Sequence, residues 1–240
     1  MFLASILSFG LVAGWVVNLI ADTVPNGLPV WQHWNLPVKR LTRSVALAPD
    51  GLELDGLDTL SKMSGRIFWR HIAVWVLTIY LGCVAYLASE TFIHAFVLSV
   101  QAWCFLTIAV IDIEHRLVLN RILLWMLPII FLCNTIAGLP SFSSSVLGGV
   151  AGFALFLALA IAWPGGMGMG DVKLAGVIGL ATGFSGVLIA IFIGILSGGV
   201  AAIAILIFTR MRGGATMAYA PYLVFGAWIA LYSGSQFWYM

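Results

Sequence analysis

Long apolar runs separated by short polar segments occupy most of the chain. Because a membrane-spanning helix needs about 20 mostly apolar residues, we interpret each run of roughly this length as a transmembrane helix. The pattern predicts eight of them, over residues 2–21, 71–89, 95–112, 121–138, 146–163, 172–183, 187–208 and 215–233. The sixth run is short, and it spans only if Lys173 reaches towards the interface and neighbouring helices bury its ends. We therefore expect an all-α, polytopic membrane bundle of about eight transmembrane helices.

The same pattern divides the chain into three parts. Residues 1–21 form the first helix, which we expect to be retained because the apolar run lacks the basic start of a secretory signal. Residues 22–70 form the only long polar connection. Two short alternating arms around Pro49-Asp50-Gly51 predict a β-hairpin within it, over Val45–Gly56. Residues 71–240 contain the other seven predicted helices.

Composition and charge agree with a membrane protein and predict its orientation. Of the 240 residues, 62% are hydrophobic and 8% are charged, and the mean hydropathy is +1.09. All eleven basic residues fall on one side of the alternating helices: Lys39, Arg40, Arg43, Lys62, Arg66, Arg70, Arg116, Arg121, Lys173, Arg210 and Arg212. Since cytoplasmic loops are enriched in Lys and Arg, we expect these loops in the cytoplasm and both termini outside.

Metal, cofactor and nucleic-acid sites are not indicated. The three cysteines lie inside predicted spans without paired spacing, and the four histidines are scattered, so neither a metal nor another cofactor is expected. The formal net charge is only +2, and the basic residues line a membrane face. A nucleic-acid partner is therefore not expected, and the lipid bilayer is the expected surroundings.

Two acidic residues lie at the cytoplasmic ends of predicted helices. Asp112 ends the third helix and Asp171 begins the sixth. Each has a structural explanation, since Asp171 suits a helix N-cap and Asp112 the point where a helix leaves the bilayer. Together they could form a coupled pair in which one carboxyl holds the proton and the other is ionised. Such a pair can activate water for peptide-bond hydrolysis.

A glycine-rich stretch precedes Asp171. Gly168 and Gly170, with Met169 between them, allow the main chain to approach another backbone closely. An extended substrate could pair with this stretch beside the carboxylates. The alternative is a flexible turn after Pro164. Lys173, two residues past Asp171, could meet an acidic substrate residue or the anionic lipid surface, and we favour lipid.

Four segments resemble a known family. The stretch "GMGDVKLAGVIG" contains the Gly-x-Gly-Asp motif of type IV prepilin peptidases at Gly168–Asp171. The stretch "DIEHRLVLN" is similar to the family segment that begins with Asp112, with Leu119 in place of the usual proline. The N-terminal segment keeps Gly14, Asn18 and Pro25, and the C-terminal "MAYAPYLVFGAW" also fits. The chain thus resembles the type IV prepilin peptidases, which are aspartyl proteases of the inner membrane.

This resemblance implies an aspartyl peptidase core over residues 71–240, with Asp112 and Asp171 as catalytic residues. The implied substrate is a prepilin or pseudopilin-like protein, cleaved after its basic leader at the cytoplasmic membrane face. Glu114 either positions that leader or simply occupies a short loop. Many members also methylate the new N-terminus and commonly carry two Cys-x-x-Cys pairs in the first cytoplasmic loop. Residues 22–70 contain no cysteine, so we expect a peptidase without zinc and leave methylation open.

Three other functions fit parts of the pattern. A non-catalytic structural subunit derived from such a peptidase would explain the altered N-terminal motif and Leu119. Another Gly-x-Gly-Asp protease would cut within a spanning helix, although Ile111 precedes Asp112 where those proteases have tyrosine, and no Pro-Ala-Leu occurs. A transporter could use the two acids as a cation site, but it would place them nearer the bilayer centre.

Overall fold

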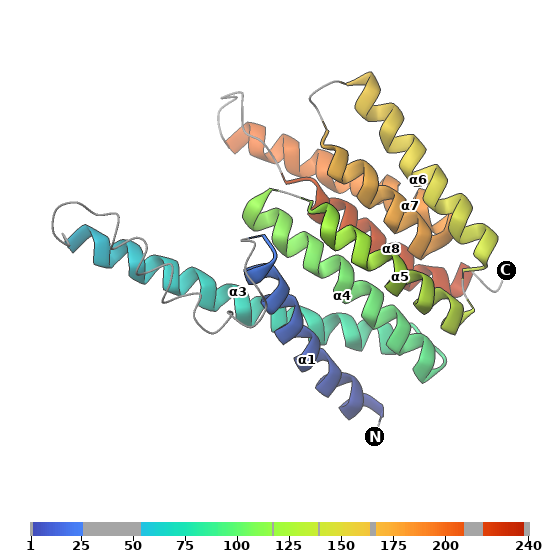
Figure 1. Ribbon diagram of the computed structural model, residues 1–240, viewed down its shortest axis with the longest axis horizontal. Coiled ribbons are helices and arrows are strands. Elements are labelled where there is room, and N and C mark those ends of the chain that lie inside the picture. The colour runs from blue at the N-terminus through green and yellow to red at the C-terminus, as the bar shows by residue number, and fades with distance from the viewer. Residues whose placement is uncertain are drawn as a thin grey trace.

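The computed structural model describes residues 2–25, 54–116, 118–138, 140–163, 167–208 and 218–237. Every regular element in these ranges is a helix (Figure 1). In chain order the helices are α1 (Phe2–Thr23), α3 (Leu54–Leu87), α4 (Phe92–His115), α5 (Asn120–Ala137), α6 (Phe142–Ala162), α7 (Met169–Phe208) and α8 (Ala220–Phe237). Six of these described helices, α1 and α3 to α7, are long and apolar enough to cross a membrane, and the apolar part of α8 is shorter. The predicted all-α membrane bundle is confirmed.

Helix α7 contains two of the predicted spans. Its helical geometry is interrupted at Gly183, where φ is 71° and ψ is −175°, a conformation that essentially only glycine adopts. A Cβ added to Gly152 of α6 would lie 2.5 Å from the Ala175 carbonyl oxygen and 3.0 Å from Val187 Cγ2. Residues on both sides of the break therefore lie against α6 at the same level, and Figure 1 shows α7 turning back on itself. The predicted runs 172–183 and 187–208 are thus separate helical segments.

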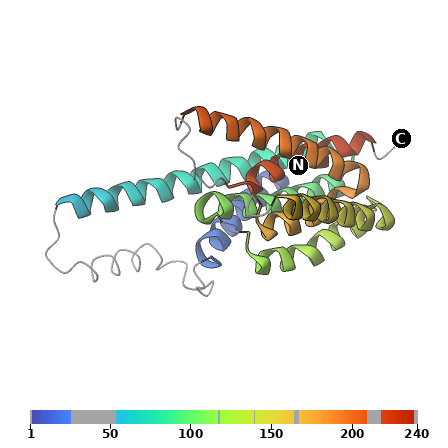
Figure 2. The ribbon, with the colours of Figure 1, turned by 90° about the horizontal axis from the view of Figure 1, so that it is seen from above.

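Helix α3 begins at Leu54, well before the predicted start at residue 71. Figure 2 shows its first part projecting beyond the other helices. Hydrophobic runs reveal where a helix meets lipid, so they do not detect a polar extension of the same helix. Residues 54–56, the end of the predicted hairpin, are helical. The rest of that hairpin lies outside the described residues.

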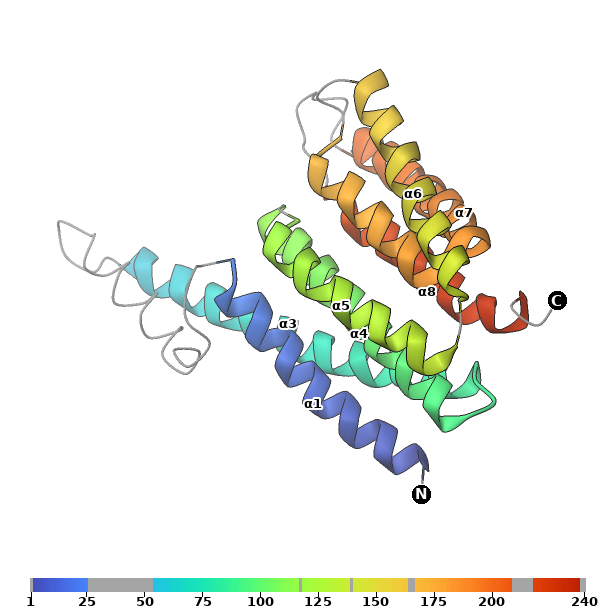
Figure 3. The same cartoon turned by 45° about the vertical axis from the view of Figure 1, so that its right-hand side comes forward.

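Glycines let several helices approach closely, among them the pairs Gly148/Gly152 of α6 and Gly194/Gly198 of α7, whose four-residue spacing is visible in the sequence. A side chain at Gly148 would collide with the backbone of α7, and one at Gly194 would lie 3.2 Å from Leu223 Cα of α8. Helices in a bilayer associate through close packing of small residues, because lipid supplies no hydrophobic force between them. Figure 3 shows α6 and α7 side by side. These contacts hold the two parts of α7 between α6 and α8.

The N-terminal helix packs mainly against α3. A Cβ added to Gly14 would lie 2.5 Å from Trp75 Cδ1 and 2.9 Å from Thr78 Oγ1. Asn18, one turn later, is buried and donates from Nδ2 to the Gly14 carbonyl at 3.0 Å. Gly14, one of the three residues that the N-terminal segment shares with the family motif, therefore permits the close contact between α1 and α3, while Asn18 is bonded within α1.

A buried polar cluster joins α4, α5, α6 and α7. Gln101 Nε2 donates to Asn134 Oδ1 at 2.7 Å. Asn134 Nδ2 in turn donates to Ser145 Oγ at 3.1 Å and to the Leu180 carbonyl at 2.8 Å. Buried polar groups are costly unless they are hydrogen-bonded, so this cluster favours one register of the four helices. Gln101 and Leu180 lie on the two helices that carry Asp112 and Asp171.

Candidate active site

Asp112 lies near the C-terminal end of α4 and is only 4% exposed. Its Oδ2 accepts a hydrogen bond of 3.1 Å from the backbone N–H of Ala220, the first residue of α8. The first N–H groups of a helix have no partner within the helix, and the helix dipole favours negative charge there. The carboxylate therefore occupies the N-terminal end of a helix more than 100 residues away along the chain. The sequence predicted that Asp112 ends the helix. In the structure α4 continues to His115, so Asp112 lies inside the helix and is more buried than predicted.

Asp171 lies in the first turn of α7. The Gly168 carbonyl accepts hydrogen bonds from the N–H groups of Asp171, at 3.0 Å, and Val172, at 3.4 Å. The Gly168 N–H in turn donates to the Asp171 carboxyl group. Gly168 is thus the N-cap residue and Asp171 the third residue of the helix, whose carboxyl group reaches back to the N-cap N–H as in one half of a capping box. The structural alternative, in which Asp171 is itself the N-cap, is therefore incorrect.

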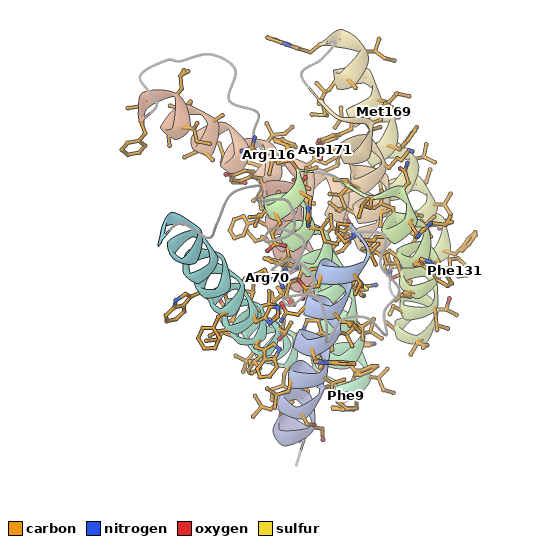
Figure 4. All side chains as sticks on the ribbon, turned by 60° about the vertical axis from the view of Figure 1, so that its left-hand side comes forward. Phe9, Arg70, Arg116, Phe131, Met169 and Asp171 are labelled. Carbon is orange, nitrogen blue, oxygen red and sulfur yellow. The ribbon has the colours of Figure 1, made fainter. Side chains whose placement is uncertain are left out.

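The two carboxyl groups lie close enough for the charge of Asp112 to act on Asp171. A Cβ added to Gly170 would lie 2.7 Å from Val118 Cβ and 3.3 Å from the Val118 carbonyl oxygen. The glycine stretch thus packs directly on the segment that follows Asp112. Figure 4 shows Asp171, Met169 and Arg116 towards the same end of the bundle, away from Phe9. The tertiary structure brings both acids to one end, as the alternation of spans predicts.

Glycine has different roles at the two positions of the motif. At Gly170 the close approach of Val118 excludes a side chain. At Gly168 an added Cβ would meet Asp171 Oδ2 at 3.5 Å and the Gly170 nitrogen at 3.9 Å, both ordinary contact distances. Met169, between them, begins α7 and is 53% exposed. Close backbone approach is therefore a property of Gly170, and it is made within the protein.

Leu119 replaces the proline usual in the segment after Asp112. It is the N-cap residue of α5 and has φ −76° and ψ 118°. Proline fixes φ at about −65 ± 15°, so the backbone at Leu119 keeps the conformation that proline would impose. The replacement leaves the local main-chain path intact.

Tyr219 is a site residue that the sequence analysis missed. Its ring packs against Phe156, with centroids 6.3 Å apart, and against Gly198. Burial, and secondarily the nearby Asp171 carboxylate, raise the pKa of the Tyr219 hydroxyl to about 12. The hydroxyl therefore keeps its proton near neutral pH and can donate a hydrogen bond. The C-terminal segment "MAYAPYLVFGAW" contains this tyrosine, so the family resemblance marked the segment but not the residue.

Comparison with known proteins identifies the family. The model of the type IV leader peptidase family matches residues 99–203, a range that contains both aspartates. A prepilin leader peptidase/N-methyltransferase of Bacillus subtilis (strain 168) is 30% identical over 171 residues, which are 71% of this chain and 69% of that protein. The chain belongs to the type IV leader peptidase family. The predicted resemblance is confirmed.

Other members of this family align over smaller parts of their length. The prepilin leader peptidase/N-methyltransferase of Neisseria gonorrhoeae is 30% identical over 72% of this chain and 55% of its own length. The protein of the same name from Stutzerimonas stutzeri is 26% identical over 56% of this chain and 48% of its own length. This chain thus spans about half the length of these two relatives. No solved structure matches the chain.

Lys173 connects the two motifs of this leader peptidase family member. Its Nζ donates to Asn120 Oδ1 at 2.8 Å. Asn120 belongs to the stretch that begins with Asp112, and Lys173 follows Asp171 on α7. The prediction that Lys173 meets lipid or substrate remains a prediction. The structure gives the side chain a partner within the protein, at an exposed position.

Glu114 takes part in an ion-pair cluster that the sequence analysis did not predict. Its Oε2 lies 2.9 Å from Arg70 Nη1, and Arg70 Nη2 lies 2.6 Å from Asp22 Oδ1. His71 Nε2 lies 3.3 Å from the other oxygen of Asp22. Arg70 was counted only as a basic loop residue, yet its side chain is just 12% exposed. The cluster joins α1, α3 and α4 two residues beyond Asp112.

Metal-binding clusters are not found in the part of the chain that the structure describes. No group of three or more His, Cys, Asp or Glu side chains in these ranges is arranged to hold a metal ion. Cys83, Cys104 and Cys133 are free thiols inside helices.

Proposed function

We propose that this chain is a membrane aspartyl endopeptidase in which Asp112 and Asp171 together hydrolyse a peptide bond. The substrate is a type IV prepilin or pseudopilin-like protein, cut between its basic leader and the following apolar helix. The observation that carries the proposal is the convergence of two carboxyl groups, within range of each other's charge, at one end of the bundle. Membership of the leader peptidase family supports the same reaction.

The pair works as a unit that holds one proton. The ionised carboxyl takes a proton from water while the water oxygen attacks the peptide carbonyl carbon. The protonated carboxyl donates to the carbonyl oxygen, which gives a tetrahedral intermediate. When this intermediate collapses, the carbon–nitrogen bond breaks and the departing amine receives a proton from the pair. Since interacting carboxyls titrate together, the proton is assigned to the pair and not to one residue.

The surrounding residues bind and orient the substrate. The exposed Gly168 and Met169, at the N-terminal end of α7, contact the peptide beside Asp171, while Gly170 holds this end of the helix against Val118. Glu114 receives a cation of the leader, and the exposed Lys173 lies at the other side of the site. The protonated Tyr219 hydroxyl donates a hydrogen bond to the substrate beside Asp171.

The proposed location is the inner membrane, with the site at the cytoplasmic face and both termini outside. The distribution of basic residues supports this orientation, because Arg116 and Lys173 lie at the same end as the two acids.

The test is cleavage of a synthetic peptide with a basic leader and an apolar helix, in liposomes. Asp112→Asn and Asp171→Asn should each reduce the cleavage rate by about 10²–10⁴-fold or more, since positioned acid–base groups contribute that much. Glu90→Gln is the matched control, because Glu90 is an exposed carboxylate in the turn between α3 and α4. Undiminished cleavage by either aspartate variant contradicts the proposal. No cleavage by the unmodified protein favours the non-catalytic subunit.

A further inference from the structure

A lateral groove of about 1090 Å³ lies between α3 and the second half of α7, residues 184–208. Its floor is formed by α4 and α8, which pack against each other. Ala73 of α3, Ile205 of α7 and Phe225 of α8 are among the apolar residues that line it. The four helices can be followed in Figure 2. The groove is thus a mostly apolar channel along the side of the bundle.

One end of the groove adjoins the two aspartates. Ile113 and Glu114 of α4 and Pro221 of α8 line this end. Glu114 follows Asp112 by two residues, and Pro221 follows Ala220, whose N–H binds Asp112. From Leu106 to Glu114 the lining of α4 extends about 12 Å, close to half of the ~30 Å hydrocarbon core of a bilayer. The charged lining residues Arg70, Glu114 and Arg116 all lie at this end.

A second groove, of about 690 Å³, lies between α5, α6 and the first half of α7, residues 169–182. It is also apolar, but Lys173 and Asn120 are its polar lining residues, and no carboxylate is among the described residues that line it. A basic peptide is repelled by an unpaired positive charge and attracted by carboxylates. The mouth of the first groove is lined by the Glu114 carboxylate, together with Arg70 and Arg116. Arg70 is already paired with Glu114 and with Asp22, which is not a lining residue. Unlike the second groove, the first one therefore offers a carboxylate to a basic leader.

We infer that the groove between α3 and α7 receives the apolar helix of the substrate, with the basic leader emerging beside Glu114. This inference rests on the proposed peptidase function. Arg70 forms two ion pairs, one with Glu114 and one with Asp22. The pair with Glu114 is the more exposed of the two, because the Glu114 side chain is 32% exposed. A cation of the leader therefore replaces Arg70 as the partner of Glu114. Exposed pairs are the easier to separate. Arg70 remains bound to the more buried Asp22, at 17% exposure.

Photo-crosslinking tests where the substrate lies, without requiring cleavage. A photoreactive benzoylphenylalanine replaces either Phe225, in the first groove, or Phe153, in the second, in an Asp171→Asn background. The two positions are matched, since their side chains are 47% and 39% exposed. The probe is the peptide with a basic leader and an apolar helix, in liposomes. We expect a crosslink to the peptide from position 225 at least fivefold stronger than from 153.

Equal crosslinking, stronger crosslinking from position 153, or crosslinks between two copies of the chain in place of the peptide would overturn the inference. Crosslinking from 225 together with no cleavage by the unmodified protein would refute the proposed function and leave the docking surface intact. The two failures are therefore distinguishable.

A kinetic test uses a second matched pair, Ala73→Trp and Ala154→Trp. Both alanines are exposed and line the first and second groove respectively. A tryptophan that fills an occupied groove competes with the substrate for the same space, so Ala73→Trp should raise KM for the helix-bearing peptide about tenfold or more, or about 1.4 kcal/mol, with kcat little changed. Ala154→Trp should leave both unchanged, as should Ala73→Trp with a peptide truncated before the helix. An unchanged KM for Ala73→Trp and the helix-bearing peptide overturns the inference.

Discussion

The two aspartates reach similar surroundings by different routes. Asp171 is held locally, by hydrogen bonds with the backbone of Gly168, three residues away. Asp112 is held by the N–H of Ala220, on a helix formed by the far end of the chain. Both carboxyls therefore lie at a helix N-terminus, where negative charge is stabilised. The comparison teaches that one half of the proposed site depends on local sequence and the other on the docking of α8.

Separating the two acids, with both carboxyl groups kept, should strongly lower activity. In Gly170→Ala the new Cβ would lie 2.7 Å from Val118 Cβ, so the Asp171 loop must move away from the Asp112 segment. Because a displacement of about 1 Å can cost 10²-fold in rate, we expect a loss of about 100-fold in kcat/KM. Gly168→Ala is the control, since its Cβ meets Asp171 Oδ2 at 3.5 Å. Equal losses for the two alanine variants would show that the close packing at Val118 is unimportant.

Removing each carboxyl should affect stability unequally. Asp112→Ala leaves the buried Ala220 N–H without its partner, which costs about 1–3 kcal/mol. Asp171→Ala removes only a capping interaction at a half-buried position, worth about 1 kcal/mol or less. Thermal unfolding in detergent should show a lower melting temperature for Asp112→Ala, and Asp112→Asn should recover most of it. A larger loss for Asp171→Ala would contradict the comparison.

Tyr219→Phe tests the residue next to the α8 contact of Asp112. We expect kcat to fall about tenfold, equivalent to one hydrogen bond of roughly 1–1.5 kcal/mol, with KM nearly unchanged. Since the pKa of Tyr219 is raised to about 12, the hydroxyl stays protonated at every pH below that range. The pH profiles of the two proteins should therefore have the same shape below about pH 10. A profile whose alkaline limb disappears in the Phe variant would contradict this assignment.

Lys173→Met should have the smallest effect. It removes an exposed hydrogen bond to Asn120, and exposed polar pairs contribute about 0.2–1 kcal/mol. We expect at most a few-fold loss of cleavage, equal for peptides with and without an acidic residue after the cleavage site. A loss confined to the acidic peptide would instead assign Lys173 to substrate recognition.

Part of the site could be predicted because its signals are local. Eight apolar runs with short connections determine which helix ends share a membrane face, and this placed Asp112 and Asp171 together. The interruption of α7 was also predictable, because the small and polar residues within 183–186 break the apolar run in the sequence. The structure places the break at Gly183, which has a positive φ. The glycine pairs that line the helix contacts have a spacing visible in the sequence.

Other parts could not be predicted, because they depend on pairing between distant residues. From the sequence, Arg70 was interpreted as a basic loop residue. Only the structure shows its ion pairs with Asp22 and Glu114. Tyr219 has no local signal for its position near Asp171. The polar first part of α3 carries no apolar run, so its helical state was also missed.

By itself, the sequence determined that the chain lies in lipid, where its helices are, and that two acids lie at one end of the bundle. The reason is that the hydrophobicity and length of each helix are properties of one continuous segment. Only the tertiary structure decided that α8 supplies the N–H for Asp112, that Val118 requires glycine at position 170, and that a groove ends beside the pair. These features depend on contacts between helices, and no single segment contains the information about which backbone group will lie opposite its side chains.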